Sequence, residues 1–526
     1  MANFFALVRE VAERQPAALC FAVSGQSYGA VWRRVQYRAA ALRARGLKKG
    51  DVLGILSKNS PDWCVTFTAA MGLGVLALVL DTNLSSATHR EMLAHVQAKL
   101  VCVSPEFAAV DYGIPQYAIE MADPAAVFEP EPVDDADLAA LFYTSGTTGE
   151  PKVVPLTQAN LLKTTLACIE RFHAVPSDMF MTILPLYHVY GLVAGFLGAY
   201  LSGASIVFQN SLKASDILGT LARQPITIFS AVPQLWEIFL DRLLKKIKSE
   251  SPPKHAFFVF VLNNAPSLRH LGLGRLLDKL FYPVHQVFGL KLRLLISGGS
   301  RLRLRYCLYY KRLGFNLTEG YGLTETTGPI CVGKIKNATP ICVGLPLPGN
   351  QVAIRQPDKH GIGEIWLKGD AVMPGYYQNP EATREAFDAD GWFQTGDLGL
   401  LDRHGELHIR GRSKNVIVLD SGKNVYPEDI ESRYLQSPLV EEIAIFGRRI
   451  SSRETVYAVV VPAEKNQDSR EQLKAEFKKL GHGLPTYKRI GRFAVSFNPL
   501  PRTSTQKVKV HEVIQRLEAG EYQAAD

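Results

Sequence analysis

The segment Leu141–Lys152, LFYTSGTTGEPK, is the stretch around which the chain is organised. An apolar run, Leu138–Phe142, stops abruptly and is followed at positions 144–149 by four hydroxyl side chains and two glycines. Glycines let backbone N–H groups turn toward one point, hydroxyls add donors and metal ligands, and Lys152 adds a compact positive charge. These residues predict a polyphosphate-binding loop, and a plain Ser/Thr/Gly surface turn is the alternative.

This loop is neither of the two common phosphate motifs. It lacks both the Gly-x-x-x-x-Gly-Lys-Ser/Thr pattern and the Gly-x-Gly-x-x-Gly dinucleotide pattern. YTSGTTGEPK instead resembles the phosphate loop of the adenylate-forming superfamily, which includes acyl-CoA synthetases, adenylation domains and luciferases. The resemblance implies that Thr144 is also a Mg²⁺ ligand and that the phosphates of ATP are bound by Thr144, Ser145, Gly146, Thr147, Thr148, Gly149 and Lys152.

The composition is that of a large globular protein suited to anionic small molecules. A chain of 526 residues is too long for one core and indicates two or more domains. Hydrophobic residues make up 47% and charged residues 21%, and 59 Lys and Arg against 50 Asp and Glu give a net charge of +9. This surplus suits nucleotides, CoA or acidic lipid headgroups. Because there is no zinc-ligand spacing and no dense basic block, we expect no nucleic-acid partner.

The sequence predicts a cytoplasmic protein. Its seven cysteines are scattered without the spacing of a disulfide framework, which indicates reduced thiols. The start of the chain, MANFFALVREVAERQP, contains acidic residues and has no long apolar core, so it predicts an amphipathic helix and not a signal peptide. The sequence contains no run of about 18 uninterrupted apolar residues, so we expect no membrane-spanning helix.

Helices and strands are expected to alternate over residues 1–135. The patterns predict helices at 28–45 and 61–71 and buried strands at 52–56 and 75–80. Such alternation predicts a parallel sheet with helices on both faces. From Gly344 to Leu398, glycines and prolines punctuate short strands, which predicts an antiparallel β subdomain.

A second signal combines Leu294–Leu302, LLISGGSRL, with Leu317–Gly328, LTEGYGLTETTG. Tyr321 offers an aromatic face for adenine, its flanking glycines allow close backbone approach, and Glu325 supplies the hard oxygen ligand that Mg²⁺ prefers. The resemblance implies that Thr324 and Glu325 serve the α-phosphate and Mg²⁺. It also implies an adenine site made of Gly298, Gly299, Ser300, Gly320, Tyr321, Gly322 and Leu323.

The acyl pocket is expected near Pro185–Leu192, PLYHVYGL, which follows a predicted strand at 181–184. By itself, His188 is better explained as a hydrogen-bonded loop histidine. A further strand that starts at Ile226 ends at Val232 and is similar to a family strand whose end contributes to the same pocket. The resemblance therefore implies a catalytic role for His188 and an acyl pocket lined by His188, Val189, Gly191 and Val232.

The remaining site residues lie late in the chain. Asp397, in GWFQTGDL, can accept two hydrogen bonds at once and resembles the family aspartate that binds both ribose hydroxyls. The resemblance further implies that Arg412 binds ribose or phosphate and that Lys414 is a hinge. Gly422 and Lys423 would then face CoA, and Lys507 would reach the carboxylate and the α-phosphate. Gln506 stands where the family usually has glycine.

The whole pattern predicts an α/β protein. We expect a large N-terminal domain, residues 1–412, of stacked mixed sheets with flanking helices plus a β subdomain, and a small mobile α+β C-terminal lid, residues 413–526. The resemblance implies ATP-dependent, AMP-forming activation of a carboxylic acid, a long- or medium-chain fatty acid, to an acyl-adenylate and then to a CoA thioester. ATP, Mg²⁺ and CoA are the expected cofactors and substrates.

Two other functions stay open. One is a fatty acyl-AMP ligase that loads an acyl carrier protein or synthase. The other is a weakly catalytic member that binds acyl chains or nucleotide. Separately, residues 241–248, DRLLKKIK, are basic and amphipathic and begin a longer connection that runs to residue 293. This connection predicts a peripheral membrane contact, and a solvated helical excursion is the alternative.

Overall fold

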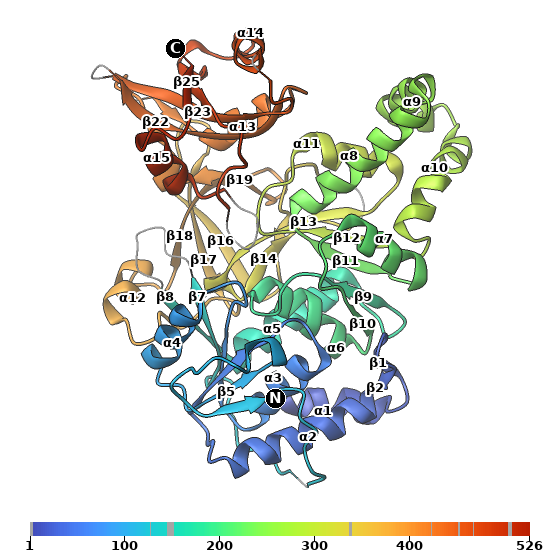
Figure 1. The fold of residues 1–526 in the computed structure, drawn as a ribbon, viewed down its shortest axis with the longest axis vertical. Helices are drawn as coiled ribbons and strands as arrows, with labels where there is room; N and C mark the ends of the chain where they lie inside the picture. The colour runs from blue at the N-terminus through green and yellow to red at the C-terminus, as the bar shows by residue number, and fades with distance from the viewer. Residues whose placement is uncertain are drawn as a thin grey trace.

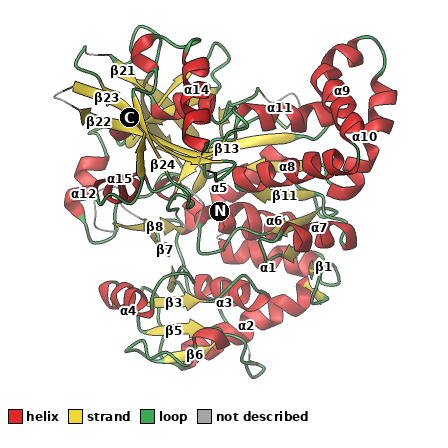
Figure 2. Cartoon of the chain, turned by 45° about the horizontal axis from the view of Figure 1, so that its top comes forward, coloured by secondary structure: helices red, strands yellow, loops and turns green. Residues whose placement is uncertain are grey.

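The computed structural model describes residues 4–126, 128–144, 152–335, 339–421, 423–450, 453–466, 468–502 and 508–525. The N-terminal part of the chain lies at the bottom of Figure 1 and the C-terminal part at the top, with the strands of a β subdomain between them. Figure 2 shows the same division, with helices gathered around the two large sheets.

The first large sheet is built mainly from parallel strands. Its central strand, β3, has five buried residues of sequence VLGIL, as expected for a strand covered on both faces. All neighbours pair in parallel except β7 and β8, which form an antiparallel hairpin that brackets residues 145–151. The strands in spatial order are β6 (Gln116–Ala118), β5 (Leu100–Val103), β3 (Val52–Leu56), β4 (Leu76–Val79), β7 (Leu138–Thr144) and β8 (Lys152–Thr157).

The second large sheet is mixed. Its central strands pair in parallel, and antiparallel partners close both of its edges. The strands in spatial order are β15 (Leu345–Pro346), β14 (Gly328–Val332), β13 (Leu317–Leu323), β12 (Leu294–Ser297), β11 (Ile228–Ala231), β9 (Met179–Thr182), β10 (Ser205–Phe208), β1 (Leu19–Phe21) and β2 (Gln26–Ser27).

Three smaller sheets follow. The β subdomain is antiparallel and consists of β16 (Asn350–Arg355), β17 (Gly363–Gly369), β18 (Phe393–Leu401) and β19 (Leu407–Arg412). The hairpin of β20 (Ile417–Val418) and β21 (Asn424–Val425) comes next. The last sheet is mixed and contains β22 (Val440–Ile450), β23 (Arg453–Pro462), β24 (Arg492–Val495) and β25 (Gln523–Ala525).

Capping residues mark the starts of the first long helices. Ser27 and Ser60 accept hydrogen bonds from backbone N–H groups of the first turns of α2 and α3, and Pro61 occupies the first position of α3. The helices of the large domain are α1 (Phe4–Arg14), α2 (Tyr28–Ala44), α3 (Pro61–Gly72), α4 (Ser86–His95), α5 (Gln158–Phe172), α6 (Gly198–Ser202), α7 (Ala214–Arg223), α8 (Pro233–Glu250), α9 (Pro252–His270), α10 (Gly274–Phe288), α11 (Leu304–Leu313) and α12 (Pro380–Ala386).

The remaining helical segments are short or lie near the C-terminus. They are α13 (Pro427–Tyr434), α14 (Ser469–Gly481) and α15 (Val510–Glu518), the π-helix η2 (Gly191–Leu197), and the 3₁₀ turns η1 (Pro105–Phe107), η3 (Thr324–Thr326), η4 (Ser413–Asn415) and η5 (Thr486–Lys488).

The largest core lies between the two large sheets. Leu53 and Ile55 of β3 and Phe180 of β9 belong to one buried cluster together with side chains of the helices between the sheets, such as Phe67. Among the described residues, the two buried clusters formed by residues 417–517 contain no side chain from the earlier chain. The prediction of stacked mixed sheets with flanking helices, a β subdomain and a smaller C-terminal domain is therefore confirmed.

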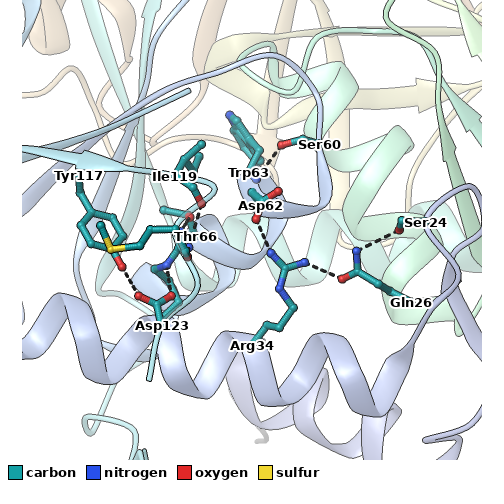
Figure 3. Close-up of polar contacts among 12 residues, drawn as sticks. Ser24, Gln26, Arg34, Ser60, Asp62, Trp63, Thr66, Tyr117, Ile119 and Asp123 are labelled. Carbon is teal, nitrogen blue, oxygen red and sulfur yellow. Dashed lines mark hydrogen bonds and ion pairs between the residues drawn. The ribbon is translucent and has the colours of Figure 1, made fainter. Parts of the chain in front are cut away.

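A polar network ties α2 to its neighbours (Figure 3). Arg38 is 1% exposed, and its Nε lies 2.5 Å from Oδ2 of Asp123. Its other nitrogens donate to Oγ1 of Thr66 and to the carbonyl of Ile119, at 2.5 and 2.8 Å. Tyr117 donates its hydroxyl to the same aspartate. Because every charge here is paired, the network joins elements far apart in sequence without leaving a buried ion unsatisfied.

Most local predictions agree with the structure. The N-terminal amphipathic helix is α1, and the expected strand at 52–56 is β3. The strand expected at 181–184 begins and ends two residues earlier, as β9, because the chain bends at Leu184 before the turn at residues 186–187. All seven cysteines are free and buried. In the part of the chain that the structure describes, no helix is both long and apolar enough to cross a bilayer.

Candidate active site

A tyrosine, an aspartate and an arginine meet between the second large sheet and the β subdomain. Asp397 of β18 lies opposite Arg412 of β19 in the antiparallel ladder. Arg412 Nε lies 3.1 Å from Asp397 Oδ1, and the hydroxyl of Tyr321, from β13, donates to Oδ2 at 2.7 Å. Burial and the nearby aspartate raise the pKa of Tyr321, so its hydroxyl stays a donor. The carboxylate thus accepts one hydrogen bond on Oδ2, is paired with Arg412 at Oδ1, and keeps lone pairs for ligand hydroxyls.

Glu325 lies in η3, directly after β13, and is linked to the ends of the β7–β8 hairpin. The hydroxyl of Tyr376 donates to Glu325 Oε1 at 3.1 Å, and Lys152 Nζ lies 4.7 Å from the centre of the Tyr376 ring. Thr144 pairs with Lys152 across the hairpin and donates its hydroxyl to that residue's carbonyl at 3.2 Å. Tyr376 therefore connects the two described ends of the predicted phosphate loop to the predicted metal ligand.

The electrostatics of Glu325 fit a cation. Burial raises the pKa of its carboxyl, while the Tyr376 hydroxyl and the charge of Arg412 act in the opposite direction. A buried carboxylate with few donors gains most from a nearby cation, and its oxygens are the ligands that Mg²⁺ prefers. The hydroxyl oxygen of Thr144 is a second hard donor nearby in the fold. This donor set fits Mg²⁺ shared with phosphate oxygens.

Glycines allow close approach on the predicted adenine side. Ser297 of β12 lies opposite Glu319 of β13, so residues 298–300 and Gly320–Gly322 continue from neighbouring strands. A Cβ on Gly322 would lie 1.7 Å from the carbonyl oxygen of Gly328, which excludes any other residue there. A Cβ on Gly298 would lie 3.0 Å from the ring of Tyr190. Strand pairing therefore brings the two predicted segments side by side, and Gly322 is required sterically.

The predicted acyl segment contacts the same site. The backbone of Val189 and Tyr190 packs on Gly328, and a Cβ on Gly299, whose φ is +87°, would lie 3.9 Å from Cγ1 of Val232. The His188 ring packs on Tyr187 at a centroid distance of 4.8 Å, and burial lowers the pKa of His188, which favours its neutral form.

Gly191 has a packing role. A Cβ at this position would lie 2.2 Å from the carbonyl oxygen of Pro185, at the start of η2. This contact explains the glycine without any acyl ligand.

Several predicted site residues fall outside the described residues: Ser145, Gly146, Thr147, Thr148, Gly149, Gly422 and Lys507. Lys414 is exposed in η4, immediately after β19. Lys423 is also exposed, and its Nζ lies 4.6 Å from the centre of the Tyr487 ring within the C-terminal domain.

The structure adds three residues that the sequence reasoning did not select. Tyr376 bridges Lys152 and Glu325, and Tyr190 packs on Gly298. Glu319 is buried, accepts a hydrogen bond from the backbone N–H of Leu302 at 3.1 Å, and so holds the segment after Gly298 in place. Burial raises its pKa to about 7. Tyr190 and Glu319 adjoin predicted residues in the sequence, whereas nothing in the surroundings of Tyr376 marks it.

Comparison with known proteins identifies the family of this chain. The family model described as "AMP-binding enzyme" matches residues 8–377, and the one described as "AMP-binding enzyme C-terminal domain" matches residues 429–507. A 2-succinylbenzoate–CoA ligase of Bacillus velezensis is 30% identical over 82% of this chain and 82% of its own length. The long-chain-fatty-acid–CoA ligase FadD15 of Mycobacterium bovis is 28% identical over 78% of this chain and 74% of its own.

The solved structures lead to the same family. ATP-bound MatB from Rhodopseudomonas palustris superposes with a TM-score of 0.79 at 26% identity, over 98% of this chain and 99% of that one. The family-model match over residues 8–377 includes the hairpin that brackets the predicted phosphate loop, Glu325 and Tyr376. The chain therefore belongs to the AMP-binding enzymes, the adenylate-forming superfamily.

Proposed function

We propose that this protein is an AMP-forming acid–CoA ligase. The proposal rests on one group of side chains in a member of the AMP-binding enzymes. Tyr321 and Arg412 contact Asp397, the charge of Arg412 acts on Glu325, and Tyr376 connects Glu325 to Lys152. The relatives named above include ligases that couple an acid to CoA. These observations support an acid and CoA as the organic substrates, with ATP as the source of the adenylyl group.

In the first step a carboxylate oxygen attacks the α-phosphorus of ATP, the acyl-adenylate forms and pyrophosphate leaves. Both reactants are anions, so the site must neutralise charge and align them. Asp397 would orient the ribose through its hydroxyls, while Lys152 would face the phosphates. Glu325 and Thr144 would hold Mg²⁺, which neutralises phosphate charge when bound. In the second step the thiol of CoA attacks the adenylate carbonyl and AMP leaves.

The assignments near the C-terminus are part of this proposal. Residues 413–526 would form a lid that rotates at Lys414 between the two steps. Lys507 would act in the first step, and the face carrying Gly422 and Lys423 would admit CoA in the second. An exposed lysine in a short turn directly after a sheet strand supports the hinge, because a hinge needs only to absorb a backbone rotation.

The hinge can be tested by blocking that rotation. Lys414→Pro should leave ATP–pyrophosphate exchange near its normal rate and slow thioester formation. Lys414→Ala is the matched control, because it removes the charge and leaves the backbone free. Equal loss of both half-reactions in Lys414→Pro would contradict the hinge.

For the acid, we propose a long- or medium-chain fatty acid. The segment from His188 to Tyr190 and Val232 brings largely apolar surface to the glycine wall, which suits an alkyl chain. One relative above carries a long-chain fatty acid in its name and the other 2-succinylbenzoate. The choice between an alkyl and an aryl acid therefore needs a direct test.

The test is end-point mass spectrometry of the purified protein with ATP, Mg²⁺ and acids from acetate to oleate, with benzoate and 2-succinylbenzoate included, each with and without CoA. We expect acyl-CoA from the longer fatty acids. A thioester only from the aryl acids would overturn the fatty-acid assignment. Acyl-AMP that accumulates and ignores CoA would overturn CoA as acceptor and favour an acyl carrier protein. ATP binding without pyrophosphate release would overturn the enzymatic proposal.

A further inference from the structure

Helices α9 and α10 carry a concentration of exposed apolar side chains. Among the described residues, nine of the twenty large apolar side chains classed as exposed lie within 257–290. Both Figure 1 and Figure 2 place α9 and α10 at the edge of the molecule, beside α8 and far from α12. The nine residues are Phe257, Phe260, Leu271, Leu273, Leu276, Leu280, Tyr282, Val287 and Leu290.

The exposed side chains of α10 form a stripe and are not part of its packing. Leu276, Leu280 and Val287 recur at helical spacing, and Leu290 continues the same face beyond the helix. An adjacent face, about one residue further round the helix, buries four other side chains in the core: Leu277, Phe281, Val284 and Phe288. Because α10 already has a complete inner face, the outer stripe contributes nothing to the fold and is available to a partner.

Helix α9 repeats this arrangement. Phe257 and Phe260 are 58% and 63% exposed, whereas the neighbouring Phe258 is buried and packs on Phe281 of α10 at a centroid distance of 5.7 Å. The contact fixes the two helices against each other. The exposed phenylalanines of α9 and leucines of α10 are therefore carried by two helices that pack on each other, and exposed apolar side chains that gather in one region in this way are typical of an interaction surface.

The charges around the stripe are almost all positive. Residues 251–291 contain five Lys and Arg, namely Lys254, Arg269, Arg275, Lys279 and Lys291, against one acid, Asp278, which pairs with Arg269 at 2.9 Å. The end of the adjoining helix α8 adds the exposed Lys245, Lys246 and Lys248. Apolar side chains rimmed by basic ones are complementary to a surface that is apolar below and negative above.

We propose that the outer surface of α9 and α10, residues 257–290, docks on the anionic face of a phospholipid bilayer. The leucine and phenylalanine side chains enter the acyl boundary, and Arg275, Lys279 and Lys254 meet the headgroups. The attachment is peripheral, because in the described residues no helix meets the length and hydropathy of a membrane span. This inference does not rest on the proposed enzymatic function, since docking requires no turnover.

The experiment is co-sedimentation of the full-length protein with vesicles of phosphatidylcholine alone and of phosphatidylcholine with phosphatidylglycerol. We expect binding to the anionic vesicles that weakens with salt. Leu276→Ser with Leu280→Ser should lower the partition coefficient by about tenfold or more. Arg275→Gln with Lys279→Gln should lower it by roughly thirtyfold, since each basic residue near such a surface contributes about fivefold.

Leu212→Ser is the matched control, because Leu212 is 62% exposed, close to the 63% of Leu276, and lies in the loop before α7. It should bind vesicles like the unchanged protein. Circular dichroism melts show whether the variants stay folded, and Leu276→Trp provides a second readout through a blue shift of its emission with anionic vesicles.

Three outcomes would overturn the proposal: no sedimentation with anionic vesicles, equal binding to neutral vesicles, or equal loss in Leu212→Ser. Light scattering that reveals a dimer lost in the Leu276→Ser, Leu280→Ser variant would instead assign the surface to a second copy of the chain.

Discussion

The same three side-chain types meet twice in this molecule, with different consequences. Asp123 accepts hydrogen bonds from Tyr117 and Arg38, whereas Asp397 accepts one from Tyr321 and forms an ion pair with Arg412. In the first group the arginine side chain is 1% exposed, and its remaining nitrogens are satisfied by Thr66 and backbone carbonyls. In the second group the arginine side chain is 31% exposed.

The two groups differ in the exposure of the arginine. We call the Asp123 group closed because its arginine is fully buried, and the Asp397 group open because its arginine is partly exposed. The Asp123 group joins α2, α3 and the segment after β6 (Figure 3). Because its arginine is fully buried, the group acts as a structural clamp. The Asp397 group lies at the junction of β13, β18 and β19. The side chain of its aspartate is as buried as that of Asp123, but its arginine is partly exposed, so one side of the group faces solvent. A Tyr-Asp-Arg constellation therefore has no function by itself, and the surrounding packing decides what it does.

The largest expected effect is on the closed group. Arg38→Met should lower the free energy of unfolding by about 3–5 kcal/mol, because it leaves the carboxylate of Asp123 buried without its partner. Urea denaturation measures this loss. ATP affinity of the protein that remains folded should be unchanged. A loss below about 1 kcal/mol would show that the clamp is dispensable.

The open group should respond in activity. Asp397→Asn should lower kcat/KM for ATP in pyrophosphate exchange by about 10- to 100-fold, the range for loss of hydrogen bonds to a charged acceptor. Asp123→Asn is the matched control and should reduce stability more than Asp397→Asn while it leaves exchange unchanged. If Asp397→Asn exchanged normally, the ribose role would be wrong.

Matched tyrosine variants remove one hydroxyl from each group. Tyr117→Phe should lower the free energy of unfolding by about 1 kcal/mol without affecting ATP. Tyr321→Phe should raise KM for ATP by about threefold to tenfold, because the donor that positions Asp397 is lost. Thermal melts and steady-state kinetics on both variants separate the effect on stability from the effect on ATP. If both variants changed stability and KM for ATP to the same extent, the assignment of one group to the fold and the other to the site would be wrong.

The smallest effect concerns pH. Burial raises the pKa of Glu325, and the Tyr376 hydroxyl opposes that rise by donating to the charged form. The carboxylate is therefore lost at a higher pH than usual as the solution is acidified. Tyr376→Phe should move the acid limb of kcat/KM for ATP upward by about 0.5 pH unit. Tyr377→Phe changes the adjacent tyrosine and should leave the acid limb of the pH profile unchanged. If Tyr376→Phe also left it unchanged, the hydrogen bond from Tyr376 would have no effect on the pKa of Glu325.

Contiguous strings in the sequence predicted most of the candidate site. The segments around Gly298, Tyr321 and Asp397 each carry their chemistry within a few residues, and strand pairing brings them together. Tyr376 could not be selected in this way. Its role depends on contacts with Lys152 and Glu325, which lie in separate parts of the chain, and its own neighbours contain no pattern that implies either contact.

The Asp123 group shows that prediction of the fold from sequence is limited in the same way. Ser27, Ser60 and Pro61 mark helix starts because capping is a local interaction, and the periodicity of 28–45 was sufficient to predict α2. That α2 contains a fully buried arginine was not predictable from this periodicity. Its partner Asp123 is 85 residues away, and only the packing of α2 against the segment after β6 brings the two charges together.

The sequence by itself predicted the family, many of the helices and strands and the candidate residues of the nucleotide site, because caps, glycine turns and short binding strings act within a few residues. Tertiary structure alone decided which Tyr-Asp-Arg group is closed and which is open, and which apolar face of α10 is buried. Leu276 and Leu277 are adjacent leucines of equal hydrophobicity, yet one is 63% and the other 3% exposed. Burial depends on what packs against a residue, and that partner comes from another part of the chain.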